Sequence, residues 1–261
     1  MSVSPFDVDS IRIQLLSAGD LDAYRESYSG NAYPELEDMS SAQLWDDLAT
    51  YDNVPEFRIR RLATVADNVP EQSKVLDVGV GWGEIIPMLK KRRISEYVGI
   101  DFSEEVVSAV SEKFPENKYI VGSVDNVEGY FDVVLALEVC EHILASKILD
   151  FYKSIYDHLR EGGRFIVTVP VYENLKAMTL KCPHCDHMHN RMGHVRSYNP
   201  DLIKAELGLA GFKVRESFFV YSIFSNTQFG RFKRAMIDIG KRLLGMQKTM
   251  PLNVVVIADK L

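Results

Sequence analysis

The feature that most constrains this 261-residue chain is the segment 75–84, which reads VLDVGVGWGE. An apolar run leads into Asp77, and Gly79, Gly81 and Gly83 follow at alternate positions before a helix-like stretch. Glycine lets the backbone turn sharply and lets a ligand approach it closely. The segment therefore predicts a strand, a tight turn and a helix, with a ligand at the carboxyl end of the strand.

A second acid strengthens this interpretation. Asp101 closes the next apolar run, eighteen residues beyond Gly83, where an acid can accept hydrogen bonds from both hydroxyls of a ribose. The glycine spacing G-x-G-x-G differs from the G-x-G-x-x-G that holds a dinucleotide pyrophosphate, so it favours a ligand without pyrophosphate. The structural alternative is that the glycines only make turns and that Asp101 caps a helix together with Ser103.

From Lys74 onward, short apolar runs alternate with amphipathic stretches. The runs 75–78, 97–100, 119–121, 132–137 and 164–169 are predicted strands, and 84–92, 104–113 and 147–159 are predicted helices. A helix stop is expected at 161–163, a later helix at 200–209, and two later strands at 213–224 and 253–258. This alternation, with strands that are almost wholly apolar, predicts an α/β fold with a parallel, doubly wound sheet.

Over about residues 70–260 the chain resembles the class I S-adenosylmethionine (SAM)-dependent methyltransferases. The resemblance implies a Rossmann-like sheet of seven strands. It also implies that Asp77 and the three glycines surround the methionine part of SAM and that Asp101 holds the ribose. This family often has Asp where the chain has Ser123, so backbone groups of Ser123 and Val124 are expected to serve the adenine. The cofactor site implied in full is Asp77, Gly79, Gly81, Gly83, Asp101, Phe102, Ser123, Val124, Leu137 and Glu138.

The predicted organisation has two parts. Residues 1–70 are expected to form a helical cover over the cofactor cleft, and residues 71–261 the SAM-binding domain. Within that domain, 172–198 is a Cys/His-rich insertion, and 230–248 is a basic amphipathic helix. Such a helix either contacts an anionic membrane surface or packs on the domain with its charged face in solvent.

The fourth predicted strand runs into Glu138, Glu141 and His142, an E-x-x-E-H motif similar to that of ubiquinone-biosynthesis-like O-methyltransferases. In that subgroup these residues face the substrate and can support a divalent cation. A hydroxyl that attacks the methyl group must lose a proton, which His142 or Glu141 can accept. A magnesium ion would instead lower the pKa of the hydroxyl. We take His142 as the base, with Glu141 beside it; the alternative is that the acids only cap the following helix.

The insertion concentrates two cysteines and four histidines within residues 182–194. A C-x-x-C turn followed closely by histidines is typical of zinc sites. The set Cys182, Cys185, His189 and His194 predicts a structural zinc, with His184 or His187 as substitutes for one histidine. The alternative is a reduced loop whose histidines contact substrate or solvent. His194 also lies in a G-H-V-R-S-Y segment that resembles the substrate side of many small-molecule methyltransferases, so both roles stay open.

Charge and composition argue against several classes of function and location. A net charge of −7 argues against broad nucleic-acid binding. The first ten residues lack the basic start and apolar core of a signal peptide, and no apolar stretch is long enough to span a bilayer. Three cysteines, two of them at C-x-x-C spacing, suit a reducing compartment, so a cytoplasmic location is expected.

The predicted function is transfer of a methyl group from SAM to a small molecule, with a hydroxyl favoured as acceptor. One alternative is a SAM-binding or zinc-containing scaffold without turnover. The other is a nicotinamide-dependent oxidoreductase, which the glycine spacing disfavours. The sequence gives no prediction of the oligomeric state.

Overall fold

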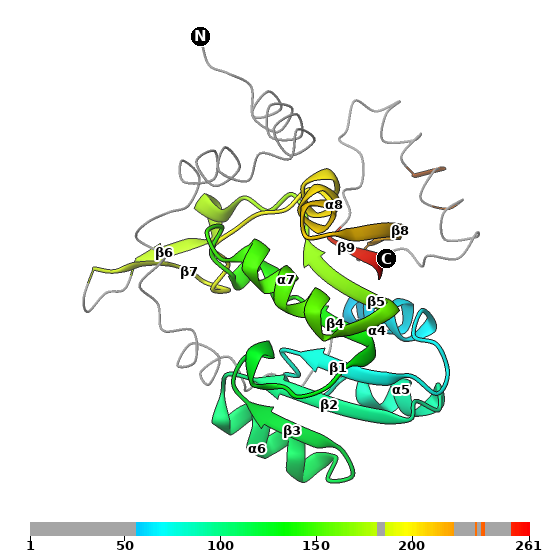
Figure 1. The fold of residues 1–261 in the computed structure, drawn as a ribbon. Helices are drawn as coiled ribbons and strands as arrows, with labels where there is room; N and C mark the ends of the chain where they lie inside the picture. The colour runs from blue at the N-terminus through cyan, green and yellow to red at the C-terminus, as the bar shows by residue number, and fades with distance from the viewer. Residues whose placement is uncertain (1–55, 182–185, 222–232, 234–235, 238–251) are drawn as a thin grey trace.

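The computed structural model describes residues 56–181, 186–221, 233, 236–237 and 252–261 (Figure 1). Its centre is a seven-stranded sheet in the order β3-β2-β1-β4-β5-β9-β8. The strands are β1 (Lys74–Val78), β2 (Glu96–Asp101), β3 (Lys118–Val121), β4 (Phe131–Leu137), β5 (Leu159–Pro170), β8 (Phe212–Val220) and β9 (Asn253–Lys260). The seven-stranded Rossmann-like sheet expected from the sequence is confirmed.

The direction of one strand differs from the prediction of a parallel sheet. Strands β1 to β5 pair in parallel, but β9 is antiparallel to both β5 and β8. The six residues Asn253–Ala258 are all buried or nearly so. A strand buried on both faces is a continuous apolar run in either direction, so its sequence does not encode which way it points.

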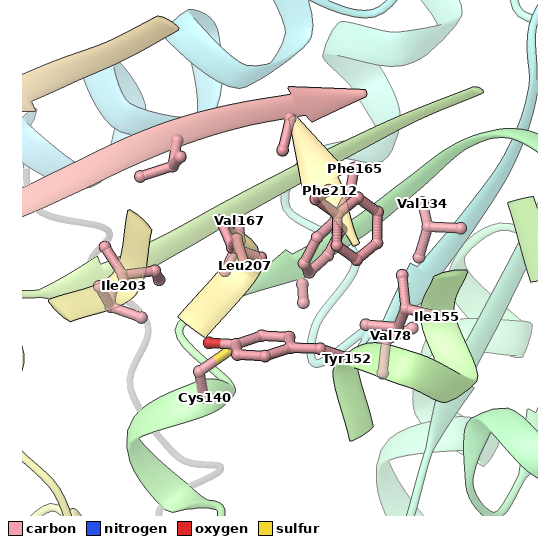
Figure 2. Close-up of a cluster of buried hydrophobic side chains, with 14 of the residues drawn as sticks. Val78, Val134, Cys140, Tyr152, Ile155, Phe165, Val167, Ile203, Leu207 and Phe212 are labelled. Atoms are coloured by element: carbon pink, nitrogen blue, oxygen red, sulfur yellow. The ribbon is translucent and has the colours of Figure 1, made fainter. Parts of the chain in front are cut away.

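Helices cover both faces of the sheet (Figure 1). On one face, α4 (Glu56–Asp67), α5 (Ile86–Lys91) and α6 (Glu104–Lys113) enclose one apolar cluster. On the other, α7 (Ile148–His158) and α8 (Pro200–Leu209) enclose the second. Figure 2 shows part of this second cluster, where Tyr152 of α7 lies between Cys140 and the aromatic pair Phe165 and Phe212. The doubly wound arrangement is therefore confirmed.

Two helices begin at the residues predicted from the sequence. Ser103 accepts a hydrogen bond from the backbone N–H of Val106 at the start of α6, and Asn199 caps α8 ahead of Pro200. In contrast, α7 ends at His158, before the expected stop at 161–163. Residues 161–163 instead lie in β5, where the pairing with β4 shifts register between Phe131 and Val133. The two glycines accommodate this irregularity of the strand.

The two ends of the segment 172–198 lie next to each other at the end of β5. Val171 bridges Tyr198, and the Tyr172 N–H donates to the Tyr198 carbonyl at 2.8 Å. Between them lie the short helix η4 (Leu175–Met178) and a two-stranded hairpin of β6 (Thr179–Lys181) and β7 (Met188–Asn190). The segment is therefore an insertion that begins and ends next to the carboxyl end of β5.

Several predictions fall outside the described residues. These are most of the helical cover at 1–70, residues Cys182 and Cys185, and all but three residues of the basic segment 230–248. Within the described part of the chain, none of the helices is long and apolar enough to cross a bilayer.

Candidate active site

The predicted cofactor residues meet at one edge of the sheet. Strands β3, β2, β1 and β4 lie side by side and point the same way, so their carboxyl ends are adjacent. Asp77 lies near the end of β1, Asp101 ends β2, Ser123 follows β3 and Leu137 ends β4. The structure thus brings together residues that are up to 60 positions apart in the sequence.

The turn after β1 needs glycine for two different reasons. Gly81 has φ +49°, and a Cβ there would meet no atom within 4 Å, so the turn is open on this side. Gly83 has φ +65°, and a Cβ there would lie 2.8 Å from side-chain atoms of Ile86 and Val110. One glycine therefore leaves space for a ligand, and the other lets the first turn of the following helix pack closely.

Asp101 is already oriented by the backbone around it. Its Oδ2 accepts from the N–H of Gly81 at 3.1 Å, and its Oδ1 accepts from the N–H of Ser103 at 3.1 Å. The carboxylate therefore links the glycine turn to the start of α6. Each oxygen can accept more than one hydrogen bond, so two hydroxyls of a ribose can still bind there.

Asp77 is buried near the carboxyl end of β1, which lies between β2 and β4 in the sheet. It is 2% exposed, and its Oδ2 accepts from the Tyr97 hydroxyl at 2.6 Å. Burial raises the pKa of Asp77 from 3.8 to about 7; the Tyr97 hydrogen bond opposes this shift, and the Asp101 carboxylate adds to it. Burial therefore favours the protonated form of Asp77 well above the pH at which an exposed aspartate ionises.

We expect this carboxyl to make the stability of the cofactor-free protein depend on pH. Between pH 4 and 7 the folded state keeps a proton that the unfolded state has lost, so stability falls as pH rises through this window. The fall should be on the order of 4 kcal/mol in the wild type. Chemical denaturation of wild type and Asp77→Asn at several pH values measures it.

Asp77→Asn should lack this part of the pH dependence, because an amide does not titrate. Tyr97→Phe should extend the fall to higher pH, because it removes the hydrogen bond that lowers the pKa of Asp77. Identical pH profiles for wild type and Asp77→Asn would show that Asp77 is not responsible.

The adenine side contains three predicted residues. Ser123 begins the short helix η2 (Val124–Asn126), and its N–H donates to Asn126 Oδ1 at 2.8 Å. Val124 is buried, whereas Phe102 is 63% exposed next to Asp101. The Ser123 hydroxyl also donates a hydrogen bond to Asn126 Oδ1, so it stabilises the turn that begins η2.

Glu138, directly after β4, is held in an unusual conformation. It has φ +60°, a left-handed conformation that costs a side chain about 1 kcal/mol or more. Its Oε1 accepts from Thr168 at 2.7 Å, and its Oε2 accepts from Asn253 at 2.6 Å and pairs with Arg61 at 2.7 Å. Helix α4 and strands β5 and β9 therefore fix the turn that follows β4.

This turn connects the cofactor side to a second group of polar residues. A Cβ on Gly79 would lie 2.6 Å from Val139 Cγ2, so the glycine turn and the residue after Glu138 are in direct contact. The next residues form the short helix η3 (Cys140–His142). Glu141 and His142 therefore follow, in the chain, a residue that contacts the glycine turn.

Glu141 is fully buried. Neither of its carboxyl oxygens has a hydrogen-bond partner among the described residues. Burial raises the pKa of Glu141 well above its usual value, and the carboxylates of Glu138 and Glu173 add to the shift while Arg61 opposes it. Its backbone carbonyl accepts from the N–H groups of Val195 and Arg196.

His142 and His194 pack against each other, with ring centroids 4.8 Å apart and planes at 75°. His142 Nδ1 lies 3.0 Å from the Gly193 carbonyl, and His194 Nδ1 lies 2.7 Å from Glu173 Oε2. Since these oxygens can only accept, both Nδ1 atoms carry the hydrogen. Burial, together with His194, lowers the pKa of His142 to about 3, against the opposing effect of the Gly193 carbonyl. His142 is therefore neutral at physiological pH.

The structure divides the predicted metal ligands. His194 lies with Glu141 and His142, where one ligand atom from each residue is within 4.8 Å of the others. His189 belongs to strand β7, and its ring stacks on that of His187 at 6.5 Å. Cys182 and Cys185 lie outside the described residues.

Sequence reasoning missed the residues that hold the site in place. These supporting residues are Arg61, Tyr97, Thr168, Glu173 and Asn253. Each lies 20 or more positions from the residue that it contacts, and nothing in their local sequence marks them. Only the fold brings them to their partners.

Comparisons with known proteins agree with this geometry. Residues 51–217 match a family described as "Methyltransferase domain". A ribosomal protein L11 methyltransferase of Symbiobacterium thermophilum is 30% identical over 112 residues, which is 41% of this chain and 35% of that protein. The match thus spans about a third of the length of that relative.

Solved structures share the fold. One is a methyltransferase of Haloferax volcanii in complex with the Trm112 methyltransferase activator, with TM-score 0.58, 18% identity and coverage of 84% of this chain and 97% of that one. Another is magnesium protoporphyrin IX methyltransferase of Synechocystis with bound S-adenosylhomocysteine (SAH), with TM-score 0.54, 18% identity and coverage of 84% and 93%.

Proposed function

This chain belongs to the class I SAM-dependent methyltransferases, and from this premise we propose that its acceptor is a hydroxyl group of a small molecule. The observation that carries the proposal is the contact between Gly79 and Val139. It supports the proposal because Glu141 and His142 follow Val139 closely in the chain, and the turn that Val139 contacts is the one that we assign to SAM.

The reaction requires one proton to leave. The acceptor oxygen forms a bond to the methyl carbon as the bond from that carbon to sulfur breaks, and the electron pair stays on sulfur, giving neutral SAH. We propose that the neutral ring of His142 accepts the hydroxyl proton, with Glu141 beside it as the second catalytic candidate. Asp101 holds the ribose, and Asp77 with the glycine turn holds the methionine part, which aligns the methyl with its acceptor.

The resemblance to the ubiquinone-biosynthesis-like subgroup supports a hydroxyl acceptor, but the magnesium that it implies does not fit these residues. Magnesium prefers carboxylate oxygens and water. Both Glu138 oxygens are already engaged by Arg61, Thr168 and Asn253, which leaves Glu141 as the one carboxylate of the motif that faces the histidines. We therefore route no step through magnesium. A structural zinc that includes Cys182, Cys185 and His189 stays a separate proposal about the insertion.

Calorimetric titration of SAM, SAH and NADH into the protein tests the cofactor assignment. We expect SAM and SAH to bind and NADH not to bind. Asp101→Ala should weaken SAM and SAH binding by about 10²–10⁴-fold, because two hydrogen bonds to a charged group are lost. Asp157→Ala, which removes an exposed acid of α7, is the matched control and should bind SAM like wild type.

An acceptor screen then tests turnover. SAH formation from SAM is followed with phenols, catechols, aliphatic alcohols, amines and carboxylic acids as acceptors. Turnover with hydroxyl compounds alone supports the proposal, and turnover with amines alone contradicts it. If SAM binds but no acceptor reacts, a SAM-binding scaffold without turnover becomes the better description.

A further inference from the structure

The Tyr97 hydroxyl is a buried polar group whose partner lies in the cofactor site. Tyr97 is 3% exposed, and its hydroxyl donates to Asp77 Oδ2 at 2.6 Å. In the pairing of β1 with β2, Tyr97 lies opposite Val75 and Gly99 lies opposite Asp77, so all four share one face of the sheet. Gly99 has no side chain, and Tyr97 reaches the Asp77 carboxyl from two residues away.

The Tyr97 ring is fixed by its neighbour on β3. It packs edge-to-face against the Tyr119 ring, with centroids 6.3 Å apart, and the Tyr119 hydroxyl donates to the Phe114 carbonyl at 3.2 Å. A Cβ on Gly99 would lie 3.0 Å from Tyr119 Cδ1, so glycine lets this ring pack closely. Burial, together with the Asp77 carboxylate, raises the pKa of Tyr97 well above its usual value. The Tyr97 hydroxyl therefore stays protonated and can donate.

The other oxygen of Asp77 lacks a partner. Oδ1 is buried and accepts no hydrogen bond from the described residues. The titratable groups that act on Asp77 from neighbouring strands are Tyr97 and Asp101 of β2 and Tyr119 of β3, and none of them is a cation. On the β4 side its neighbour is the apolar Leu135. A buried carboxylate is costly unless a donor or a cation reaches it, and SAM carries an ammonium group.

We propose that Tyr97 is a positioning residue for the cofactor: its hydroxyl occupies Oδ2 of Asp77 and leaves Oδ1 for the ammonium group of SAM, directly or through one water. The proposal rests on the proposed function, which assigns Asp77 to the methionine part of SAM. The hydrogen bond from Tyr97 fixes the orientation of the carboxyl and favours its ionised form, which attracts the ammonium group.

Cofactor binding should then displace a proton from Asp77. In the cofactor-free protein burial raises the pKa of Asp77 to about 7, although the Tyr97 hydrogen bond opposes this shift. Because the ammonium group requires the carboxylate, affinity should rise with pH up to about 7 and level off above it. Without the Tyr97 hydroxyl the pKa of Asp77 rises further, so affinity should level off at a higher pH.

A matched pair of ligands tests the proposal. SAH and 5′-methylthioadenosine share the nucleoside and the sulfur, but only SAH carries the amino-acid part with its ammonium group. Both are titrated calorimetrically into full-length wild type and Tyr97→Phe at pH 6.5 and pH 8.5. Tyr97→Phe should weaken SAH binding by about 10–100-fold at pH 6.5, because a hydrogen bond to a charged group is lost, and by less at pH 8.5. Its affinity for methylthioadenosine should equal that of wild type.

Tyr119→Phe is the matched control variant. It removes a hydroxyl from the neighbouring ring on the same face of the sheet, but this hydroxyl bonds to the Phe114 carbonyl and not to Asp77. It should bind both ligands like wild type. Tyr97→Met, which fills the space with an apolar side chain, repeats the test independently of Tyr97→Phe. Binding of methylthioadenosine confirms that each variant keeps a folded nucleoside site.

Two results would overturn the proposal. One is a Tyr97→Phe protein with wild-type affinity for SAH at both pH values. The other is an equal loss of affinity for SAH and methylthioadenosine, which leaves Tyr97 only a structural role. If wild type binds neither ligand, the proposal and the cofactor assignment fall together. If the ligands bind as expected but only amines react in the acceptor screen, the positioning role stands and the hydroxyl acceptor does not.

Discussion

Arg196→Ala is expected to destabilise the protein by about 3–5 kcal/mol, because it leaves a buried carboxylate without its cation. Arg196 is 3% exposed and Glu206 is fully buried, and the two side chains form an ion pair. The guanidinium also lies over the Tyr198 ring, 4.8 Å from its centroid. Glu206 also accepts from the Tyr152 hydroxyl at 3.4 Å, a neutral donor that does not replace the cation. Chemical denaturation at neutral pH measures the loss.

Two further variants separate the unpaired charge from simple loss of packing. Arg196→Met/Glu206→Leu removes both charges and should recover most of the stability. Arg215→Ala breaks an ion pair with Asp259 whose arginine is half exposed, and should cost less than about 1 kcal/mol. If Arg196→Ala lowered the free energy of unfolding no more than Arg215→Ala does, the expected contribution of the buried pair to stability would be wrong.

His142→Ala is expected to lower kcat by about 10²–10⁴-fold with any hydroxyl acceptor found in the screen, the range typical of losing a group that handles a proton. SAM affinity should change little, because His142 lies on the acceptor side of the Gly79–Val139 contact. The measurement is initial-rate SAH formation at saturating SAM, together with calorimetric SAM titration of the same protein.

His187→Ala serves as the comparison, since this histidine stacks on His189 at the hairpin, away from the His142–His194 pair. It should retain the wild-type kcat. A His142→Ala enzyme that keeps nearly all of its activity would remove His142 from the mechanism. Equal losses in both variants would point to a general effect on the segment.

Much of the sheet could be predicted because most of its strands contain short apolar runs and its turns carry their own signals. The expected bounds of α6 and α8 match the structure, in which Ser103 and Asn199 cap them. The direction of β9 and the start of β5 could not be predicted. Both depend on which strand lies next to which, and that is a property of the whole sheet.

The candidate site divides in the same way. Asp101 and the glycine turn follow from local spacing, and their geometry agrees with the expectation. The partners of Glu138 and His194 could not be predicted from local spacing. Arg61, Asn253 and Glu173 lie 21 to 115 positions away from them in the sequence. The sequence marked His194 as chemically important without indicating which of its two candidate neighbourhoods it occupies.

The position of β9 has a consequence for how this protein is synthesised. Strand β8 joins the sheet only through β9, and β9 also covers the outer edge of β5. On the ribosome, β1 to β5 and β8 are all complete before β9 emerges. Until then the edge of β5 that β9 will cover is apolar and unpaired, and β8 has no partner strand. Exposed strand edges of this kind associate wrongly or recruit a chaperone. Premature termination before Asn253 should therefore yield aggregated protein rather than a smaller working domain.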